Sequence, residues 1–177
     1  MDKKGITFSV QMTAKEVYKF TVYHVYHGFS GLFGLFLSLI ALINLILNFG
    51  TMTDQARTIM IIVAMWFTVL EPIMMIGRAK SQVKRTKAYQ KPLQYQVNED
   101  GITVLQDEVS QTIEWNQLVK IVETNSQFLV YSSNIHAFIF PKSMLEGQME
   151  AMREAILEYT KETNVKLKGK IKRTHNK

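Results

Sequence analysis

Two long apolar runs dominate the first half of the chain. Residues 29–49 make a run of 21 residues without a charged side chain. At about 1.5 Å rise per residue, such a helix is roughly 31 Å long, which matches a bilayer hydrocarbon core of about 30 Å. Residues 59–76 form a second run of 18 residues, interrupted only by Glu71 and Pro72. The pattern predicts a transmembrane hairpin over residues 29–77, with spans at 29–49 and 59–76.

Small and polar side chains gather on one side of each predicted span. At 100° per residue they are Gly31, Gly34, Ser38, Ala41 and Asn48 in the first span and Ala64, Thr68 and Glu71 in the second. Lipid-embedded helices associate through close backbone approach and interhelical hydrogen bonds. We therefore expect these two faces to meet, with Glu71 turned inward.

Glu71 is the ionisable group inside the second span, and such a group is a functional candidate by default. It lies five residues before the end of the run, so the headgroup layer is near. Pro72 removes a backbone donor and frees a carbonyl one turn earlier, which often draws in a hydroxyl or a water. Two interpretations stay open. Glu71 pairs structurally with Ser30, His27 or a nearby base, or it serves a small transporter, a channel accessory or a proton-linked membrane component.

A basic segment follows the second span, and residues 78–92 are predicted to be a connector that extends its helix. Its bases, which no acid interrupts, are Arg78, Lys80, Lys84, Arg85, Lys87 and Lys91. The loop between the spans, residues 50–58, carries one acid and one base. Bases near span ends remain cytoplasmic, so both termini are expected inside. The six bases are expected to contact anionic headgroups of the bilayer.

The region before the first span, residues 1–28, is predicted to hold a strand and an interfacial helix. Residues 5–12 alternate apolar and polar side chains, which is typical of a half-buried strand. Thr13 with Glu16 forms a capping box that opens the helix. We expect the strand to join the sheet that follows the spans and to cover one of its edges.

After Pro92 the pattern changes to short strands separated by turn-forming residues. They are predicted at 93–97, 102–105, 109–115, 118–123, 128–131 and 136–140. Val109, Ile113 and Trp115 should share the buried face of an antiparallel meander. A second capping box, Ser143 with Glu146, should open a helix.

The predicted helix has a single apolar stripe, made of Leu145, Met149, Met152, Ile156 and Tyr159. Residues 93–163 are thus expected to form a small cytoplasmic domain, an antiparallel sheet or open barrel capped by this C-terminal helix. Residues 164–177 are expected to be a basic tail, disordered or on the membrane.

Candidate chemistry is sparse. The chain has no cysteine, and His24 with His27 supplies two metal ligands where a site needs more. No phosphate-binding glycine-rich loop or nucleophile motif occurs, so no cofactor, no metal and no enzyme activity is predicted. The net charge of +6 lies beside the membrane and in a tail without aromatic residues, which argues against nucleic acid.

Several segments between residues 95 and 145 carry a family resemblance, namely YQVNEDGI, IEW, NQLVKIVET, FLVYSS and IFPKSML. Together with the preceding arm and two spans, they resemble the YcxB-like family of bacterial membrane proteins. The resemblance implies a membrane α+β protein in the bacterial inner membrane, with a domain similar to bacterial pleckstrin-homology-like (PH-like) domains. It implies no site residues. The expected function is a membrane-anchored binding or scaffolding protein for a lipid headgroup, a peptide or a membrane-protein partner.

Overall fold

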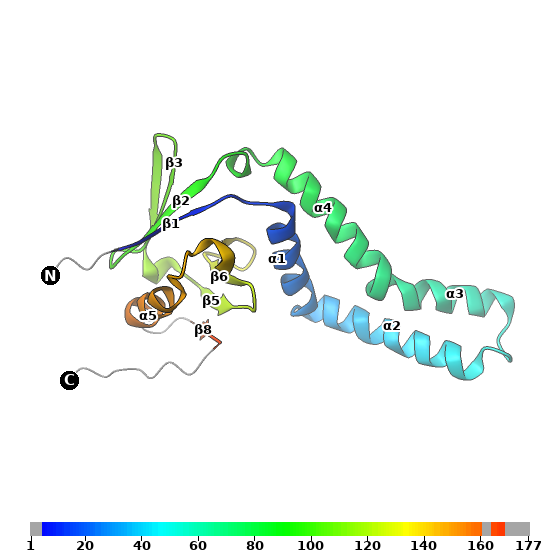
Figure 1. Cartoon of the computed structure of the whole chain (residues 1–177). Coiled ribbons are helices and arrows are strands. Elements are labelled where there is room, and N and C mark those ends of the chain that lie inside the picture. The colour runs from blue at the N-terminus through cyan, green and yellow to red at the C-terminus, as the bar shows by residue number, and fades with distance from the viewer. Residues whose placement is uncertain (1–4, 161–163, 169–177) are drawn as a thin grey trace. The chain divides into compact units, whose positions relative to one another are not determined.

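The chain divides into two compact units, one of which interrupts the other in sequence. The computed structural model describes residues 5–160 and 164–168. Thr13–Arg85 form one unit, here called the helical unit. The residues up to Met12 and those from Thr86 onward form the second, the sheet unit (Figure 1).

The helical unit is built from two pairs of packed helices. Its elements are α1 (Ala14–Tyr26), α2 (Phe29–Asn48), α3 (Asp54–Met65), the π-helix η1 (Trp66–Leu70) and α4 (Glu71–Arg85). α3, η1 and α4 form one uninterrupted helix of 32 residues. α2 packs along α3, and α1 packs along α4. The side chain of Thr13 caps α1 by accepting a hydrogen bond from the N–H of Glu16 at 3.4 Å.

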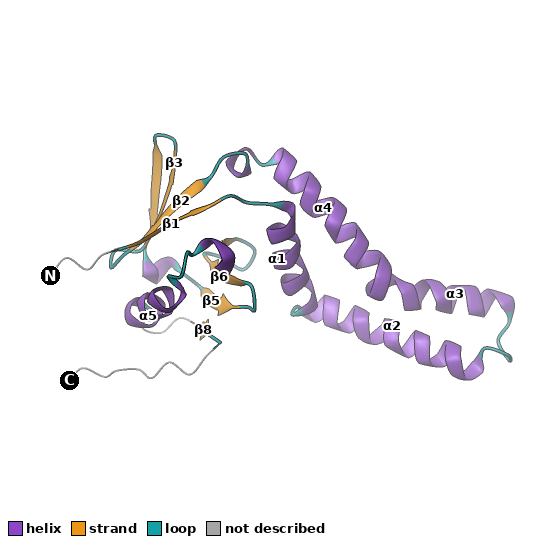
Figure 2. Ribbon diagram, in the orientation of Figure 1, coloured by secondary structure: helices purple, strands orange, loops and turns teal. Residues whose placement is uncertain are grey.

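The sheet unit contains two four-stranded sheets (Figure 2). The first is antiparallel and has the order β1 (Ile6–Val10), β2 (Leu93–Val97), β3 (Ile102–Gln106), β4 (Val109–Ile113). The second has the order β7 (Ala137–Pro141), β6 (Gln127–Tyr131), β5 (Lys120–Glu123), β8 (Asn164–Lys166). In it β8 pairs with β5 in parallel, and the other pairs are antiparallel. Short 3₁₀ turns η2 (Lys87–Tyr89), η3 (Trp115–Gln117) and η4 (Lys142–Met144) precede α5 (Met149–Tyr159).

The pairing of β1 with β2 places both connections to the helical unit at one end of the first sheet. Ile6 lies opposite Val97, and Val10 lies opposite Leu93. This agrees with the expectation that the strand within residues 5–12 joins the sheet and covers one of its edges. The chain therefore leaves for the helical unit after β1 and returns at the same sheet end to begin β2. The two connecting segments are also bonded, since Gln11 Nε2 donates to the carbonyl of Tyr89 at 2.9 Å.

Aromatic side chains join the two sheets. Phe8 stacks on Tyr95 with ring centroids 5.5 Å apart, and both contact the ring of Phe140. Burial raises the pKa of the Tyr95 hydroxyl, so this residue stays neutral within the core. On α5, Met152 and Ile156 are buried, as the predicted apolar stripe requires. The coarse prediction of an α+β chain with two long apolar helices and antiparallel sheets is confirmed.

Two local predictions in the sheet unit are wrong. The pattern predicts a buried face for Val109, but this side chain is 72% exposed, and no residue of β4 is buried. The predicted Ser143–Glu146 capping box does not open the helix. Glu146 and Gly147 instead adopt positive φ angles of 45° and 82°, which end the 3₁₀ turn η4, and α5 begins at Met149.

The predicted boundary at residue 164 also needs correction. Asn164–Lys166 form β8, which pairs with β5 from Lys120 to Val122 and extends the second sheet. The expectation of a tail that is disordered or on the membrane is therefore wrong for Asn164–Lys166, which belong to the second sheet. The rest of the tail, residues 169–177, lies outside the described residues.

Candidate functional site

The contact between α2 and the long helix is built on small side chains. The buried residues of α2 are Gly31, Gly34, Ser38 and Ala41, four of the five that the sequence places on the packing face. The fifth, Asn48, is exposed, and Gly31 lies against the backbone of Val25 in α1 rather than against the long helix. On the facing helix Ala64 is buried, at 6% exposure. A Cβ atom on Gly34 would lie only 2.2 Å from the ring of Phe67. The aromatic ring thus fills the space that glycine leaves.

The second predicted face is wrong at Thr68, which is exposed. Its hydroxyl bonds within its own helix, to the carbonyl of Ala64 at 2.7 Å. The side chain that meets α2 is instead Phe67. The physical reason is the π-helix at Trp66–Leu70, because a π-turn holds one residue more than an α-turn and rotates every later side chain. A projection at 100° per residue fails from that point on.

Ser38 is inserted into the backbone ladder of the opposite helix. Its hydroxyl donates to the carbonyl of Val63 at 2.8 Å and accepts from the N–H of Phe67 at 3.4 Å. In an α-helix these two backbone groups would bond to each other. The side chain of Ser38, which is fully buried, therefore bridges the gap that the π-turn opens.

A second hydroxyl completes the π-turn. Glu71 donates its N–H to the carbonyl of Trp66, five residues earlier. Pro72, the next residue, has no N–H for the carbonyl of Phe67. The hydroxyl of Tyr26 donates to that carbonyl at 2.7 Å. The presence of Pro72 predicts a free carbonyl bound by a hydroxyl, and the Phe67 carbonyl with the Tyr26 hydroxyl fits this. The carbonyl lies five residues before Pro72 rather than four.

Glu71 forms an ion pair with a base one heptad along the same helix. Its Oε1 lies 2.9 Å from Nη1 of Arg78. The Glu71 side chain is 13% exposed and that of Arg78 is 63% exposed. Of the partners proposed for Glu71, the structure thus shows the nearby base.

The six predicted headgroup-contacting bases are all exposed. Arg78, Lys80, Lys84 and Arg85 lie on α4, which extends the second apolar run into the connector as predicted. Lys87 lies in η2 of the sheet unit. Lys91 forms an exposed ion pair with Asp107, with Nζ 2.8 Å from Oδ2.

The outward surface of the long helices is apolar. Exposed large side chains include Leu32, Phe36, Ile43 and Ile46 on α2 and Ile59, Ile62 and Ile73 on the long helix. A groove of about 450 Å³ on α2 is lined only by leucine and phenylalanine. Both helices are long and apolar enough to cross a membrane.

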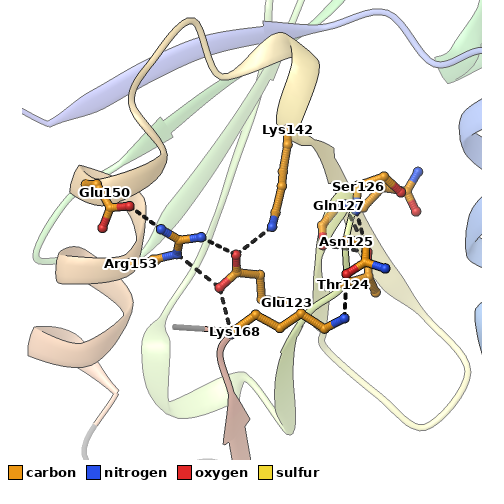
Figure 3. A network of polar contacts seen from close by, with 9 residues as sticks. All are labelled: Glu123, Thr124, Asn125, Ser126, Gln127, Lys142, Glu150, Arg153 and Lys168. Atoms are coloured by element: carbon orange, nitrogen blue, oxygen red, sulfur yellow. Dashed lines mark hydrogen bonds and ion pairs between the residues drawn. The ribbon is translucent and has the colours of Figure 1, made fainter. Parts of the chain in front are cut away.

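A buried carboxylate in the sheet unit forms a network that sequence reasoning missed (Figure 3). The side chain of Glu123 has no exposed surface. Its Oε1 lies 2.5 Å from both Lys142 Nζ and Arg153 Nη2, and its Oε2 accepts from Arg153 Nε at 3.1 Å. The backbone N–H of Lys168 donates to Oε2 at 2.9 Å. One signal was available, since Glu123 shares the strand face of the buried Ile121.

The network determines the ionisation of its members. Burial by itself would raise the pKa of the Glu123 carboxyl, but the hydrogen bonds from Arg153, Lys142 and Lys168 together lower that pKa below its ordinary value. The hydrogen bond to Glu123 in turn raises the pKa of Arg153. The four members of the network, Glu123, Lys142, Arg153 and Lys168, all belong to the sheet unit. They connect β5, η4, α5 and the segment after β8.

Metal ligands are not gathered in the described part of the chain. Among residues 5–160 and 164–168, no group of three or more histidine, aspartate or glutamate side chains is placed to hold a metal ion. Nδ1 of His27, the C-cap residue of α1, lies 3.0 Å from the carbonyl oxygen of Tyr23, so this ring nitrogen is engaged locally.

Comparisons with known proteins agree with the resemblance in the strand region. The model of the YcxB-like protein family matches residues 97–156, from the last residue of β2 into α5. No curated protein and no solved structure matches the chain. The matched segment includes Glu123 and its two basic partners, as well as the exposed strand β4. Residues 97–156 of this chain are therefore a YcxB-like domain.

Proposed function

We propose that this chain is a membrane-anchored, non-catalytic binding or scaffolding protein. The helical unit crosses the bacterial cell membrane twice, and the sheet unit lies on the cytoplasmic side. There it presents a PH-like domain to a lipid headgroup, a peptide or a membrane-protein partner. The observation that carries the proposal is the insertion of the helical unit between β1 and β2, two paired strands of one sheet.

This insertion anchors the sheet unit by two covalent links. A hairpin with two spans returns to the side of the membrane from which it started. Because Val10 and Leu93 are paired neighbours, both ends of the hairpin must lie on the side that holds the sheet. An anchor with a single link would allow the domain free rotation, whereas two links at adjacent strands restrict it.

The strand arrangement supports the PH-like assignment. Four antiparallel strands form one sheet, three consecutive antiparallel strands form most of the other, and a helix follows them. This agrees with the domain that the family resemblance implies. The second sheet also contains β8, a short strand that follows α5 and pairs with β5 in parallel.

The pairing of Glu71 with Arg78 favours a structural role for Glu71 over transport. Placing a carboxylate near the end of a span costs less free energy when a base pairs with it. Arg78 reaches it from the exposed surface of α4. A transporter would need the Glu71 carboxylate to face a pathway for an ion or proton. The ion pair with Arg78 does not support such a role.

The orientation predicts an asymmetric labelling pattern. In intact cells, an impermeant thiol reagent should label Thr53→Cys, which lies in the loop between the long helices. Ser133→Cys, in the turn between β6 and β7, should react only after lysis. The chain has no native cysteine, so each variant carries one reactive thiol. Labelling of Ser133→Cys in intact cells would reverse the proposed orientation.

Contact between the sheet unit and anionic lipid is tested by tryptophan fluorescence. With Trp66→Phe, Trp115 becomes the single tryptophan, and its indole N–H is fixed to the carbonyl of Asn98 at 2.8 Å. In vesicles with anionic lipid, a headgroup-bound quencher should reduce Trp115 emission. Replacing Lys84, Arg85, Lys87 and Lys91 by glutamine should weaken this quenching, since each base near an anionic surface contributes about 1 kcal/mol. In neutral vesicles the change should be smaller.

A matched control separates charge from local structure. Lys91 pairs with Asp107, so its replacement also breaks an ion pair. Asp107→Asn breaks the same pair and keeps the base, and it should leave quenching unchanged or stronger. Arg78 and Lys80 are retained in every variant to preserve topology. Equal quenching in all four combinations of variant and lipid would leave the bases only a role in topology and would contradict the proposed contact.

A further inference from the structure

Three of the four outer strands in the sheet unit carry a proline or a lysine or contact another element. An exposed edge offers unpaired N–H and C=O groups, and proline, lysine or a covering element usually blocks it. β7 ends in Pro141. β8 carries Lys166 and is followed by Lys168. β1 contacts η4.

The fourth outer strand, β4, lacks such protection. Its sequence, Val-Ser-Gln-Thr-Ile, contains no proline, glycine or charge. Its residues are exposed except Ile113, which is half-buried. β3 pairs with one side of β4 along all five residues, and no strand of the described chain pairs with the other side. Every second residue of β4 therefore directs its N–H and C=O outward.

Acidic side chains flank this edge at both ends. Glu108 precedes β4 and Glu114 follows it, and both are exposed. The nearby Asp107 is already paired with Lys91. The two glutamates are six residue steps apart, with the five residues of β4 between them, which is about 20 Å along a strand. The edge thus consists of an uncharged centre between two negative ends.

We propose that β4 is a docking edge for an extended peptide segment of another protein, with an uncharged centre and a Lys or Arg at each end. The peptide adds a fifth strand to the first sheet by main-chain hydrogen bonds, and its bases meet Glu108 and Glu114. This inference rests on the proposed function and names the class of partner. Opposite charges across a strand pair are favourable, whereas like charges are not.

A second copy of the chain is a poor occupant of this edge. Antiparallel pairing of two β4 strands about Gln111 would place Glu108 of each copy opposite Glu114 of the other. Parallel pairing in register would place each glutamate beside its equivalent. Both arrangements oppose like charges at both ends of the strand, which destabilises the pair.

The test uses the full chain in detergent micelles and two labelled peptides, acetyl-KVTVTVK-amide and acetyl-EVTVTVE-amide. Fluorescence anisotropy should show that the basic peptide binds about tenfold more tightly than the acidic one. The variant Glu108→Lys with Glu114→Gln should remove this preference. Glutamine is chosen at position 114 because the side chain of Glu114 caps η3, and an amide oxygen can still accept that hydrogen bond.

Backbone methylation tests the mode of binding. Of two basic peptides N-methylated at alternate residues, in complementary positions, one should lose at least tenfold in affinity and the other should keep it, because a paired strand points alternate N–H groups to its neighbour. Equal affinity of all peptides for the native chain, or no binding, overturns the inference. A dimer that the Glu108→Lys change strengthens would also overturn it, by showing that a second copy occupies the edge. Quenching of Trp115 by anionic lipid does not involve β4, so it would still support the proposed function if the docking edge fails.

Discussion

Replacing Gly31 by alanine should destabilise the helical unit more than the same change at Gly34, the other glycine of α2. A Cβ at this position would lie 2.1 Å from the backbone oxygen of Val25, and a backbone atom cannot rotate away. We expect a loss of about 2–3 kcal/mol in the free energy of unfolding, the upper part of the range for overpacking. Gly34→Ala should cost less, about 1–2 kcal/mol, because the obstacle is the ring of Phe67, which can turn.

The matched control is Gly77→Ala in α4. A Cβ on Gly77 meets no atom within 4 Å, so the methyl group adds no clash. Alanine favours helix over glycine by up to about 1 kcal/mol, and this variant should be as stable as the native chain or more so. Unfolding of purified protein in mixed micelles with increasing denaturing detergent measures all three variants. Equal stability of Gly31→Ala and Gly77→Ala would contradict the close packing of α1 against α2.

Replacing Glu123 by alanine should unfold the sheet unit at much lower denaturant. The change leaves Lys142 and Arg153 without the carboxylate that neutralises them, although each of these side chains is about five-sixths buried, at 16% and 15% exposure. Breaking a buried ion pair from one side costs about 3–5 kcal/mol. The emission of Trp115, which packs on Tyr159 of α5 at 5.6 Å, reports the transition in the Trp66→Phe background.

The control for this variant is Glu150→Ala. Glu150 pairs with the same arginine, but it is 71% exposed. An exposed pair contributes about 1 kcal/mol or less, so this loss should be small. If the two glutamate variants lose equal stability, the burial of Glu123 has no energetic consequence.

The same network predicts a pH dependence with a definite sign. The pKa of Glu123 in the folded chain lies below its ordinary value of 4.5, because the folded state favours the carboxylate. The stabilisation is therefore fully present above about pH 4.5 and is lost as the pH falls from there through the folded pKa. Glu123→Gln should lack this part of the acid sensitivity, and denaturation at several pH values would show the difference.

The positions of the helices and most strands follow from local patterns. The two apolar runs and the alternating segments were predicted within a few residues, because span length and strand period depend on neighbours in sequence. Most of the packing face on α2 could also be predicted from the sequence, because that helix is regular and a projection at 100° per residue holds along it. Thr68 was misplaced because the π-turn depends on Ser38 and Tyr26, which lie in other helices.

Long-range pairing explains what the sequence did not reveal. β8 is only three residues long, Asn-Val-Lys, which is too short for a strand pattern in the sequence, and it forms by pairing with β5. Glu123 was read as the end of a strand, and its partners lie 19, 30 and 45 residues further along the chain. The exposure of β4 likewise depends on sheet order, which no local pattern reports.

The placement of the helical unit between β1 and β2 determines the order of events during synthesis. β1 is translated first, but its partner Leu93 follows Val10 only after the whole helical unit has been made. At about 5–20 residues per second, the ribosome needs roughly 4 to 17 seconds to cover that interval. During this time the nascent β1 has no strand to pair with. The pairing of β1 with β2 must therefore wait until both long helices have been synthesised. A chain whose synthesis stops within the helical unit cannot complete the first sheet.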